Sequence, residues 1–420
     1  MGGIAAARLA ELYGTPLLVI DLNAVDRAIA SSASVGPNVE VAYAAKAFAT
    51  VEFVRHLRRH RIGLDVCSVG ELVTAERAEL PPERLTLHGA GKTDEELRAA
   101  CDGRVGLIAV DGLEELERLA SLARRGCRAG VLLRLNVGIG ADTHAFVRTG
   151  DDTKFGIPVD DESAARAILQ ANPGLRFAGL HAHVGSQIRD EHTYFDNAEA
   201  LCDAAKRFAD AGMPVERLVA GGGFAVATNP GDASRSLELG ATLAAVADRI
   251  AEGCVRRGLA APVVGFEPGR AIVALAGTTL YRVLAVKRQS RRTFVVVDGG
   301  IAENPRPALY GARHHVAPVA PRTGEDAEMI LCGRSCENDE LGTVRLSHEI
   351  ATGDLLAMCA TGAYTYSMSG NYNRFPRPAV VGILDATVRL LARRESLEDV
   401  LRNDAVEETG HASAQAPAAF

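Results

Sequence analysis

The chain has 420 residues, of which 47% are hydrophobic and 24% are charged, and its formal net charge at pH 7 is −7. This length suits one barrel-sized domain with a companion domain, or two to three smaller units, and the composition supports a large buried core. The negative net charge argues against an extended nucleic-acid interface. No segment approaches the roughly 20 apolar residues of a membrane span. The N-terminus lacks a basic head followed by an apolar run, so we expect a cytoplasmic protein.

The eight cysteines include no CxxC pair, and we expect reduced thiols, since a chain of this length needs no disulfides.

Strand-like segments alternate with segments of helical period through the first two-thirds of the chain. One such helix is predicted over 111–126, with Asp111 as its N-cap and Gly126 as its stop signal. The strand-like segments begin at Val39, Ile62, Arg84, Arg104, Ala129, Arg176, Val215 and Pro262.

Eight alternations within about 230 residues predict a (β/α)8 barrel. A doubly wound sheet usually has fewer strands, and no strand here is followed by the dinucleotide fingerprint GxGxxG. After Arg270 the segments are strand-like with turns between them, which predicts a second, mostly antiparallel β domain. The tail from Glu407 is small and polar, and we expect it to be disordered.

Polar residues follow the predicted barrel strands, at the end where such barrels carry their active sites. Lys46 ends an apolar strand, and we expect desolvation there to keep its amine neutral for Schiff-base chemistry; a solvated lysine leaving a strand is the simpler alternative. Glu267 suits a carboxylate that keeps a pyridine nitrogen protonated, or a salt bridge to Arg270.

Two glycine turns are candidate phosphate sites, Gly185-Ser186 and Gly221-Gly222-Gly223, although both sequences also suit plain tight turns. His181 and His183 alternate on one strand, so their imidazoles share a side. No further ligand stands at metal-site spacing, so no metal is expected, and a flat ring stacked on a flat cofactor suits His183 better.

Several motifs in chain order resemble those of the group IV (fold type III) pyridoxal-phosphate-dependent decarboxylases, and within this group those of the diaminopimelate decarboxylases. In the first domain they are YAAKAF at 43–48, LDVCSVGEL at 64–72, HGAGK at 88–92, THAFVRTG with KFGI within 143–157, GLHAHVGSQI at 179–188, GGGF at 221–224 and EPGR at 267–270. In the second they are RPALY at 306–310, SCEN at 335–338, GAY at 362–364 and SMSGNYN at 367–373.

The resemblance implies a barrel domain over 22–272 that binds pyridoxal 5′-phosphate, a mostly antiparallel β-barrel domain over 1–21 and 273–406, and a homodimer with shared active sites. It implies that Lys46 carries the cofactor and that Cys336 donates a proton in catalysis. The other implied cofactor-binding residues are His183, Ser186, Gly222, Gly223, Glu267, Gly269, Arg270 and Tyr364. The implied substrate-binding residues are Arg270, Arg306, Tyr310, Glu337 and Tyr364, with the arginines as bidentate partners of a carboxylate.

The implied reaction is decarboxylation of meso-2,6-diaminopimelate to L-lysine. The family's CESGD segment is Cys336-Glu337-Asn338-Asp339-Glu340 here, which leaves open a related diamino acid or a carrier-linked amino acid as substrate. An amino-acid racemase of this architecture usually places an arginine at the pyridine nitrogen, which Glu267 opposes. A non-catalytic homologue would have lost Lys46 or Cys336.

Overall fold

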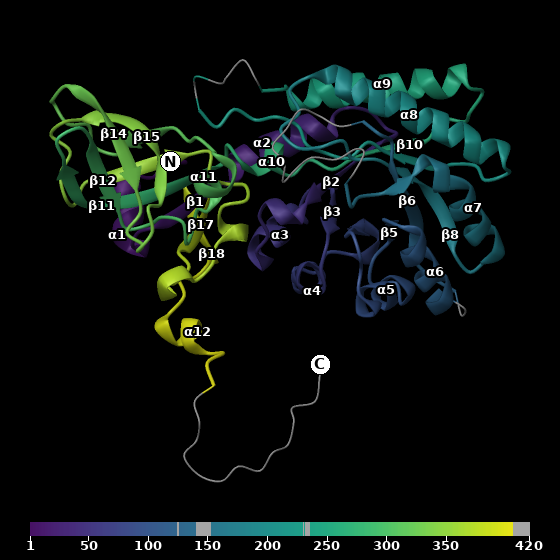
Figure 1. Ribbon diagram of the computed structural model, residues 1–420, viewed down its shortest axis with the longest axis horizontal. Coiled ribbons are helices and arrows are strands. Elements are labelled where there is room, and N and C mark those ends of the chain that lie inside the picture. Colours follow the sequence, from purple (N-terminus) through teal and green to yellow (C-terminus); the bar gives the residue numbers. More distant parts are fainter. Residues whose placement is uncertain (124–125, 140–152, 230, 232–235, 406–420) are drawn as a thin grey trace, which may run out of the picture.

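The computed structural model describes the chain except residues 124–125, 140–152, 230, 232–235 and 406–420. The THAFVRTG motif and the predicted disordered tail therefore lie outside the described residues. The described part forms two bodies, each built on its own β-sheet (Figure 1).

The first body is the predicted closed barrel of parallel strands. Its order is β2-β3-β4-β5-β6-β8-β9-β10, and β10 pairs with β2 to close the ring. All eight segments predicted to be barrel strands are strands in the structure. They are β2 (Val39–Ala44), β3 (Gly63–Val66), β4 (Leu85–Leu87), β5 (Leu107–Val110), β6 (Gly130–Asn136), β8 (Arg176–His181), β9 (Arg217–Val219) and β10 (Val263–Phe266), with a short β7 (Ile157–Pro158) beside β6. The strands are nearly continuous apolar runs because helices cover the outside and side chains fill the inside.

Helices surround the barrel, and α8 and α9 lie side by side along one edge in Figure 1. They are α2 (Leu22–Ala33), α3 (Val51–Leu57), α4 (Val69–Arg77), α5 (Asp94–Cys101), α6 (Leu113–Leu122), α7 (Glu162–Ala171), α8 (Glu191–Asp210), α9 (Leu239–Arg256) and the short α10 (Arg270–Val273). Single turns of 3-10 helix are η1 (Ala45–Ala47), η2 (Pro82–Arg84) and η5 (Val159–Asp161).

One predicted helix start is wrong. The N-cap of α6 is Gly112, with no side-chain cap, and not Asp111. The Asp111 carboxylate instead contacts the Arg134 guanidinium, with Oδ1 2.9 Å from Nη1, and accepts from the Gly156 N–H. The Asp111 side chain therefore forms an ion pair with Arg134 of the neighbouring strand β6, and not the N-cap hydrogen bond that the local sequence predicts.

The second body is the predicted, mostly antiparallel sheet, and the N-terminal strand belongs to it. Strand β1 (Leu17–Asp21) pairs antiparallel with β11 and parallel with β17. The other strands are β11 (Gly277–Arg288), β12 (Thr293–Val297), β13 (Val316–Pro318), β14 (Asp326–Cys332), β15 (Glu340–Ser347), β16 (Leu355–Cys359), β17 (Ala379–Leu384) and β18 (Thr387–Ala392). The strand-like segments recognised after Arg270 correspond to all of these strands except β13 and β15. Short helices α1 (Ala6–Tyr13), α11 (Arg306–Tyr310) and α12 (Leu397–Leu401) and the turns η7 (Tyr366–Met368) and η8 (Tyr372–Arg374) complete this part.

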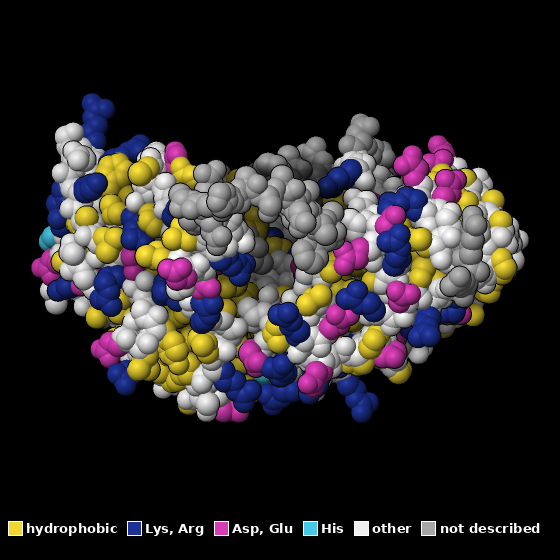
Figure 2. All heavy atoms as spheres, turned by 90° about the horizontal axis from the view of Figure 1, so that it is seen from below, with side chains coloured by type: hydrophobic (Ala, Val, Ile, Leu, Met, Phe, Trp, Pro, Cys, Tyr) yellow, Lys and Arg dark blue, Asp and Glu magenta, His cyan; other side chains and the backbone are white. Residues whose placement is uncertain are grey.

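The surface carries both signs of charge. Acidic and basic side chains are interspersed over the face seen in Figure 2, as expected from the modest net charge. None of the helices in the described part of the chain combines the length and hydropathy that a membrane span requires.

Candidate active site

A cavity of about 320 Å³ opens at the carboxyl ends of the barrel strands. Eight of the predicted site residues line it: Lys46, His183, Ser186, Gly223, Glu267, Gly269, Arg270 and Tyr364. Most come from strand ends or the turns that follow, which is where this fold concentrates functional groups. Tyr364 is contributed by the second body, so both parts of the chain form the cavity wall.

Lys46 lies in the turn η1, directly after β2, between the buried residues Ala45 and Ala47. Its side chain is exposed and makes no hydrogen bond or ion pair with any described residue. The expectation that burial would desolvate this lysine is therefore wrong for the protein without bound ligands. The apolar strand ends two residues before Lys46, at Ala44, and the turn that follows places the Lys46 side chain at the wall of the cavity.

Close backbone contacts explain the glycines after β9. A Cβ on Gly222 would lie 2.1 Å from the Glu267 carbonyl oxygen, and a Cβ on Gly223 would lie 2.1 Å from that of Gly185. Only glycine lets these three turns meet. The Gly222 N–H donates to Nδ1 of His183 at 3.1 Å, so the proton of this imidazole is on Nε2. Burial holds the pKa of His183 well below its usual value, with the nearby Lys46 cation adding to the effect, so the ring is neutral.

Two arginines meet beside the cavity without a carboxylate partner among the described residues. The Arg270 guanidinium lies 4.7 Å from the Tyr364 ring centre and donates to Ser186 Oγ at 3.4 Å. Arg306 lies over the rings of Tyr310 and Tyr364, at 4.8 and 5.5 Å. Both arginines are buried, and burial together with the Arg270 cation lowers the pKa of Arg306 to about 10. Buried cations without counter-ions are costly, which favours an anionic ligand here.

Glu267 follows β10, and its carboxylate lies between two imidazoles. His181 Nε2 is 3.0 Å from Oε2, and His88 Nε2 is 3.2 Å from Oε1. His88 also lies 3.5 Å from Oδ1 of the buried Asp65. Sequence reasoning assigned no role in the site to Asp65, His88 or His181. The sequence signal that could have identified them is their position at or next to the ends of β3, β4 and β8, which is also the position that identified Glu267 after β10.

The structure does not bring Cys336 and Glu337 to this cavity within one chain. Both are exposed between β14 and β15. The Cys336 N–H donates to Oδ1 of Asn373 at 3.2 Å, and the Tyr372 hydroxyl donates to the Glu337 carboxylate.

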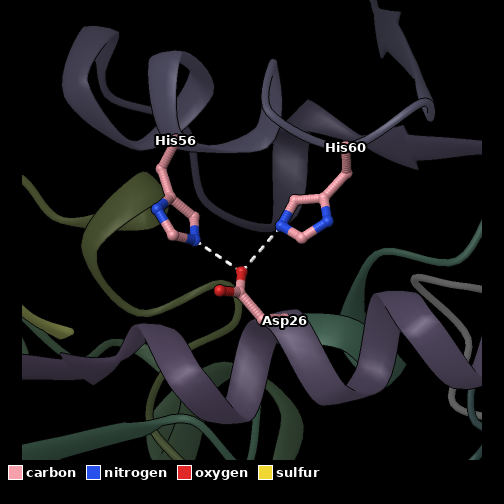
Figure 3. Close-up of side chains that lie close together, drawn as sticks. All are labelled: Asp26, His56 and His60. Carbon is pink, nitrogen blue, oxygen red and sulfur yellow. Dashed lines mark hydrogen bonds and ion pairs between the residues drawn. The ribbon is translucent and has the colours of Figure 1, made fainter. Parts of the chain in front are cut away.

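A second cluster lies on the outside of the barrel, where Oδ1 of Asp26 contacts Nε2 of both His56 and His60, at 2.6 and 2.8 Å (Figure 3). The residue types suit a metal, but Nδ1 of His56 faces the Arg59 guanidinium at 3.5 Å. A metal on Nε2 would put the imidazole proton on Nδ1, against this cation, whereas metal-bound histidines donate that proton to an acceptor. The contacts are therefore better explained as hydrogen bonds that join α2 to α3 and to the turn that follows α3.

The cavity suits pyridoxal phosphate by the chemistry of its donors. Lys46 offers an amine to an aldehyde, Glu267 a carboxylate to a ring N–H, and Arg270 a cation with an unsatisfied buried Nε to a phosphate or carboxylate.

Comparisons with known proteins agree. The family described as "Pyridoxal-dependent decarboxylase, pyridoxal binding domain" matches residues 22–274. The diaminopimelate decarboxylase of Actinosynnema pretiosum subsp. auranticum is 42% identical over 409 residues, 96% of this chain and 92% of that protein. The Bacillus subtilis diaminopimelate decarboxylase is 38% identical over 424 residues, 98% and 96% of the two chains.

Among solved structures, diaminopimelate decarboxylase from Helicobacter pylori complexed with L-lysine superposes with a TM-score of 0.85 at 26% identity, covering 94% of this chain and 98% of that one. Together with the barrel, the cavity and its lysine, these similarities establish the family. The chain belongs to the diaminopimelate decarboxylases, within the pyridoxal-dependent decarboxylase family.

Proposed function

We propose that this chain is a pyridoxal-phosphate-dependent carboxy-lyase that converts meso-2,6-diaminopimelate to L-lysine and carbon dioxide. The observation that carries the proposal is that Lys46 and Glu267, an amine and an ionised carboxylate, face one cavity at the carboxyl ends of the barrel strands. The identity of 42% to a diaminopimelate decarboxylase supports the choice of substrate.

In this proposal each cofactor group has a partner in the cavity. Lys46 would hold the aldehyde, Glu267 would accept from the ring nitrogen, and the neutral His183 would contact the ring. Bound pyridoxal phosphate supplies an electron-withdrawing ring that accepts the electrons left when the substrate carboxylate departs. The phosphate is assigned to Ser186, Gly222, Gly223, Gly269 and Arg270, with Tyr364 touching both cofactor and substrate.

The substrate carboxylate is assigned to Arg306 and Arg270, with Tyr310 beside them. Two buried guanidinium groups that lack a described counter-ion can hold a carboxylate through bidentate, charge-assisted hydrogen bonds. The planes of Tyr310 and Tyr364 fix the Arg306 side chain, so less conformational entropy is lost when the anion binds.

We further propose a homodimer in which Cys336 and Glu337 complete the cavity of the partner subunit. Their exposure, away from the cavity of their own chain, supports this assignment. In the partner's site Cys336 would return a proton to the substrate carbon, and Glu337 would receive the far ammonium group.

We also propose that the protein is cytoplasmic. The eight cysteines are all free thiols, which agrees with this location.

One assay tests the substrate. Purified protein with pyridoxal phosphate is offered meso-diaminopimelate, ornithine, lysine and arginine separately, and carbon dioxide and the amine product are followed. We expect release from meso-diaminopimelate alone. Release from ornithine but not from meso-diaminopimelate would overturn the proposed substrate.

A related diamino acid or a carrier-linked amino acid is the second candidate, because the segment after Cys336 departs from the family's CESGD. The buried carboxylate of this segment is Asp339, which accepts from the Ile301 N–H at 3.2 Å, whereas Glu340 is exposed. Two explanations fit this arrangement equally well. In the first, the loop is one residue shorter than in the family and Asp339 is the family's aspartate. In the second, the loop has the same length and Glu340 replaces that aspartate. The departure thus adds little support for a different substrate.

A further inference from the structure

The carboxylate of Glu267 contacts histidines from two other strands, His181 through a hydrogen bond and His88 through an ion pair. His181 is the last residue of β8, and His88 follows β4. Their Nε2 atoms lie 3.0 Å from Oε2 and 3.2 Å from Oε1, one imidazole on each oxygen. The two rings are 5.2 Å apart, and the side chains of His181, His88 and Glu267 are only 1%, 14% and 13% exposed. Each carboxylate oxygen keeps a further lone pair for a donor in the cavity.

The two histidines differ in charge. Burial lowers the pKa of His181, which therefore donates to Glu267 as a neutral ring. Burial alone would also lower the pKa of His88, but the carboxylates of Glu267 and Asp65 outweigh it and raise the pKa to about 9. Burial alone would raise the pKa of Glu267. The two imidazoles outweigh this effect and hold the pKa of Glu267 well below its usual value.

The consequence concerns a shared proton. When a carboxylate meets a pyridine nitrogen, one proton lies between them, and it stays on the group that is the stronger base. A hydrogen bond to the carboxylate, and a positive charge beside it, stabilise its ionised form and weaken it as a base. The proton then remains on the nitrogen, where it strengthens the ring as an electron acceptor.

We propose that His181 and His88 are positioning residues that keep Glu267 ionised, so that the proton it shares with the ring nitrogen of bound pyridoxal phosphate stays on the ring. This inference rests on the proposed cofactor role of Glu267 but not on the identity of the substrate.

The test uses the holoenzyme loaded with cofactor that carries ¹⁵N in its ring, because the nitrogen chemical shift reports protonation without turnover. His181→Met removes the donor at similar size, and His181→Gln keeps an N–H in place of Nε2 and is the matched control. We expect wild type and His181→Gln to show a protonated nitrogen throughout the neutral pH range. In His181→Met the nitrogen should lose its proton at a pH lower by at least about one unit, equivalent to roughly tenfold in the protonation equilibrium.

His88→Met, which removes a positive charge beside the Glu267 carboxylate, provides a second test if His181→Met does not fold. Turnover should follow the nitrogen signal, with kcat falling in the Met variants while KM changes little. An unchanged nitrogen titration in the Met variants would overturn the inference, whatever their stability. A nitrogen signal that responds as expected in an enzyme inactive on meso-diaminopimelate would support the inference and reject the proposed substrate. A wild-type protein that binds no pyridoxal phosphate would overturn both.

Discussion

The carbonyl oxygen of Ala47 accepts a hydrogen bond of 2.7 Å from the backbone N–H of Tyr364, a residue of the second body. The Ser367 hydroxyl donates to the same oxygen at 3.1 Å. Tyr364 has a φ of +60°, which a non-glycine residue adopts only at a cost of about 1 kcal/mol or more. The turn that carries Lys46 is thus tied directly to the segment that places the Tyr364 ring over Arg270.

The first prediction concerns the covalent site. Borohydride treatment of the cofactor-loaded protein should attach the cofactor irreversibly to Lys46, because its amine is the cavity's Schiff-base partner. Lys46→Ala should reduce the labelling, measured by peptide mass spectrometry, to background. Lys206→Ala, which alters an exposed lysine paired with Asp210, should label like wild type. Full labelling of Lys46→Ala would refute the assignment.

Arg306 should contribute to substrate binding and not to stability. Arg306→Met removes a buried cation that has no described counter-ion, so the melting temperature should stay the same or rise. KM should rise roughly 30-fold or more, corresponding to about 2 kcal/mol for the loss of a buried charged contact. The exposed Arg313→Met is the control and should change neither quantity. A clear drop in melting temperature with unchanged KM would make Arg306 a structural residue.

The buried ion pair of the HGAGK motif should be a stability element. Lys92 Nζ lies 2.8 Å from Glu115 Oε1 and also donates to the Gly89 carbonyl at 3.0 Å. Lys92→Met leaves the Glu115 carboxylate buried without a counter-ion, which should lower the free energy of unfolding by about 3–5 kcal/mol in urea titrations.

Two comparisons separate the charge effect from loss of packing. Lys92→Met combined with Glu115→Leu should recover much of the loss, since no lone charge remains buried. Lys206→Met, which breaks an exposed pair four residues apart, should cost no more than about 0.5 kcal/mol. A double variant as unstable as Lys92→Met would contradict the explanation.

His88 should make the stability of the cofactor-free protein depend on pH. Its folded pKa of about 9 lies above the ordinary value of 6.5, raised by Glu267 and Asp65 against the effect of burial. A raised pKa contributes stability that is complete below about pH 6.5 and is lost as the pH rises toward 9. The difference in unfolding free energy between wild type and His88→Gln should therefore shrink over this interval. A difference that does not vary with pH would mean that His88 is neutral in the folded protein.

The last prediction tests the shared active site. Lys46→Ala and Cys336→Ala should each be inactive as pure proteins. If Cys336 serves the partner's cavity, unfolding and refolding the two variants together should form heterodimers in which one site has both groups. Part of the activity should then return. A mixture that stays inactive, while wild type survives the same treatment, would contradict the shared-site arrangement.

The sequence by itself determined the eight barrel strands and the residues at their ends. Apolar runs, helical period and glycine turns are local properties, so the eight barrel strands and the positions of Lys46, His183 and Glu267 at their ends could be predicted. The same locality explains why Gly222 and Gly223 were recognised as a turn.

Only the tertiary structure decided which of these residues meet, because burial and pairing join positions far apart in the chain. His88 and His181 reach Glu267 from strands that lie 179 and 86 residues earlier in the chain, a convergence that no periodicity encodes. The Asp111 side chain pairs with Arg134 and does not cap α6, since a buried carboxylate needs a partner. Lys46 proved exposed because a turn, and not the apolar strand before it, sets the direction of its side chain.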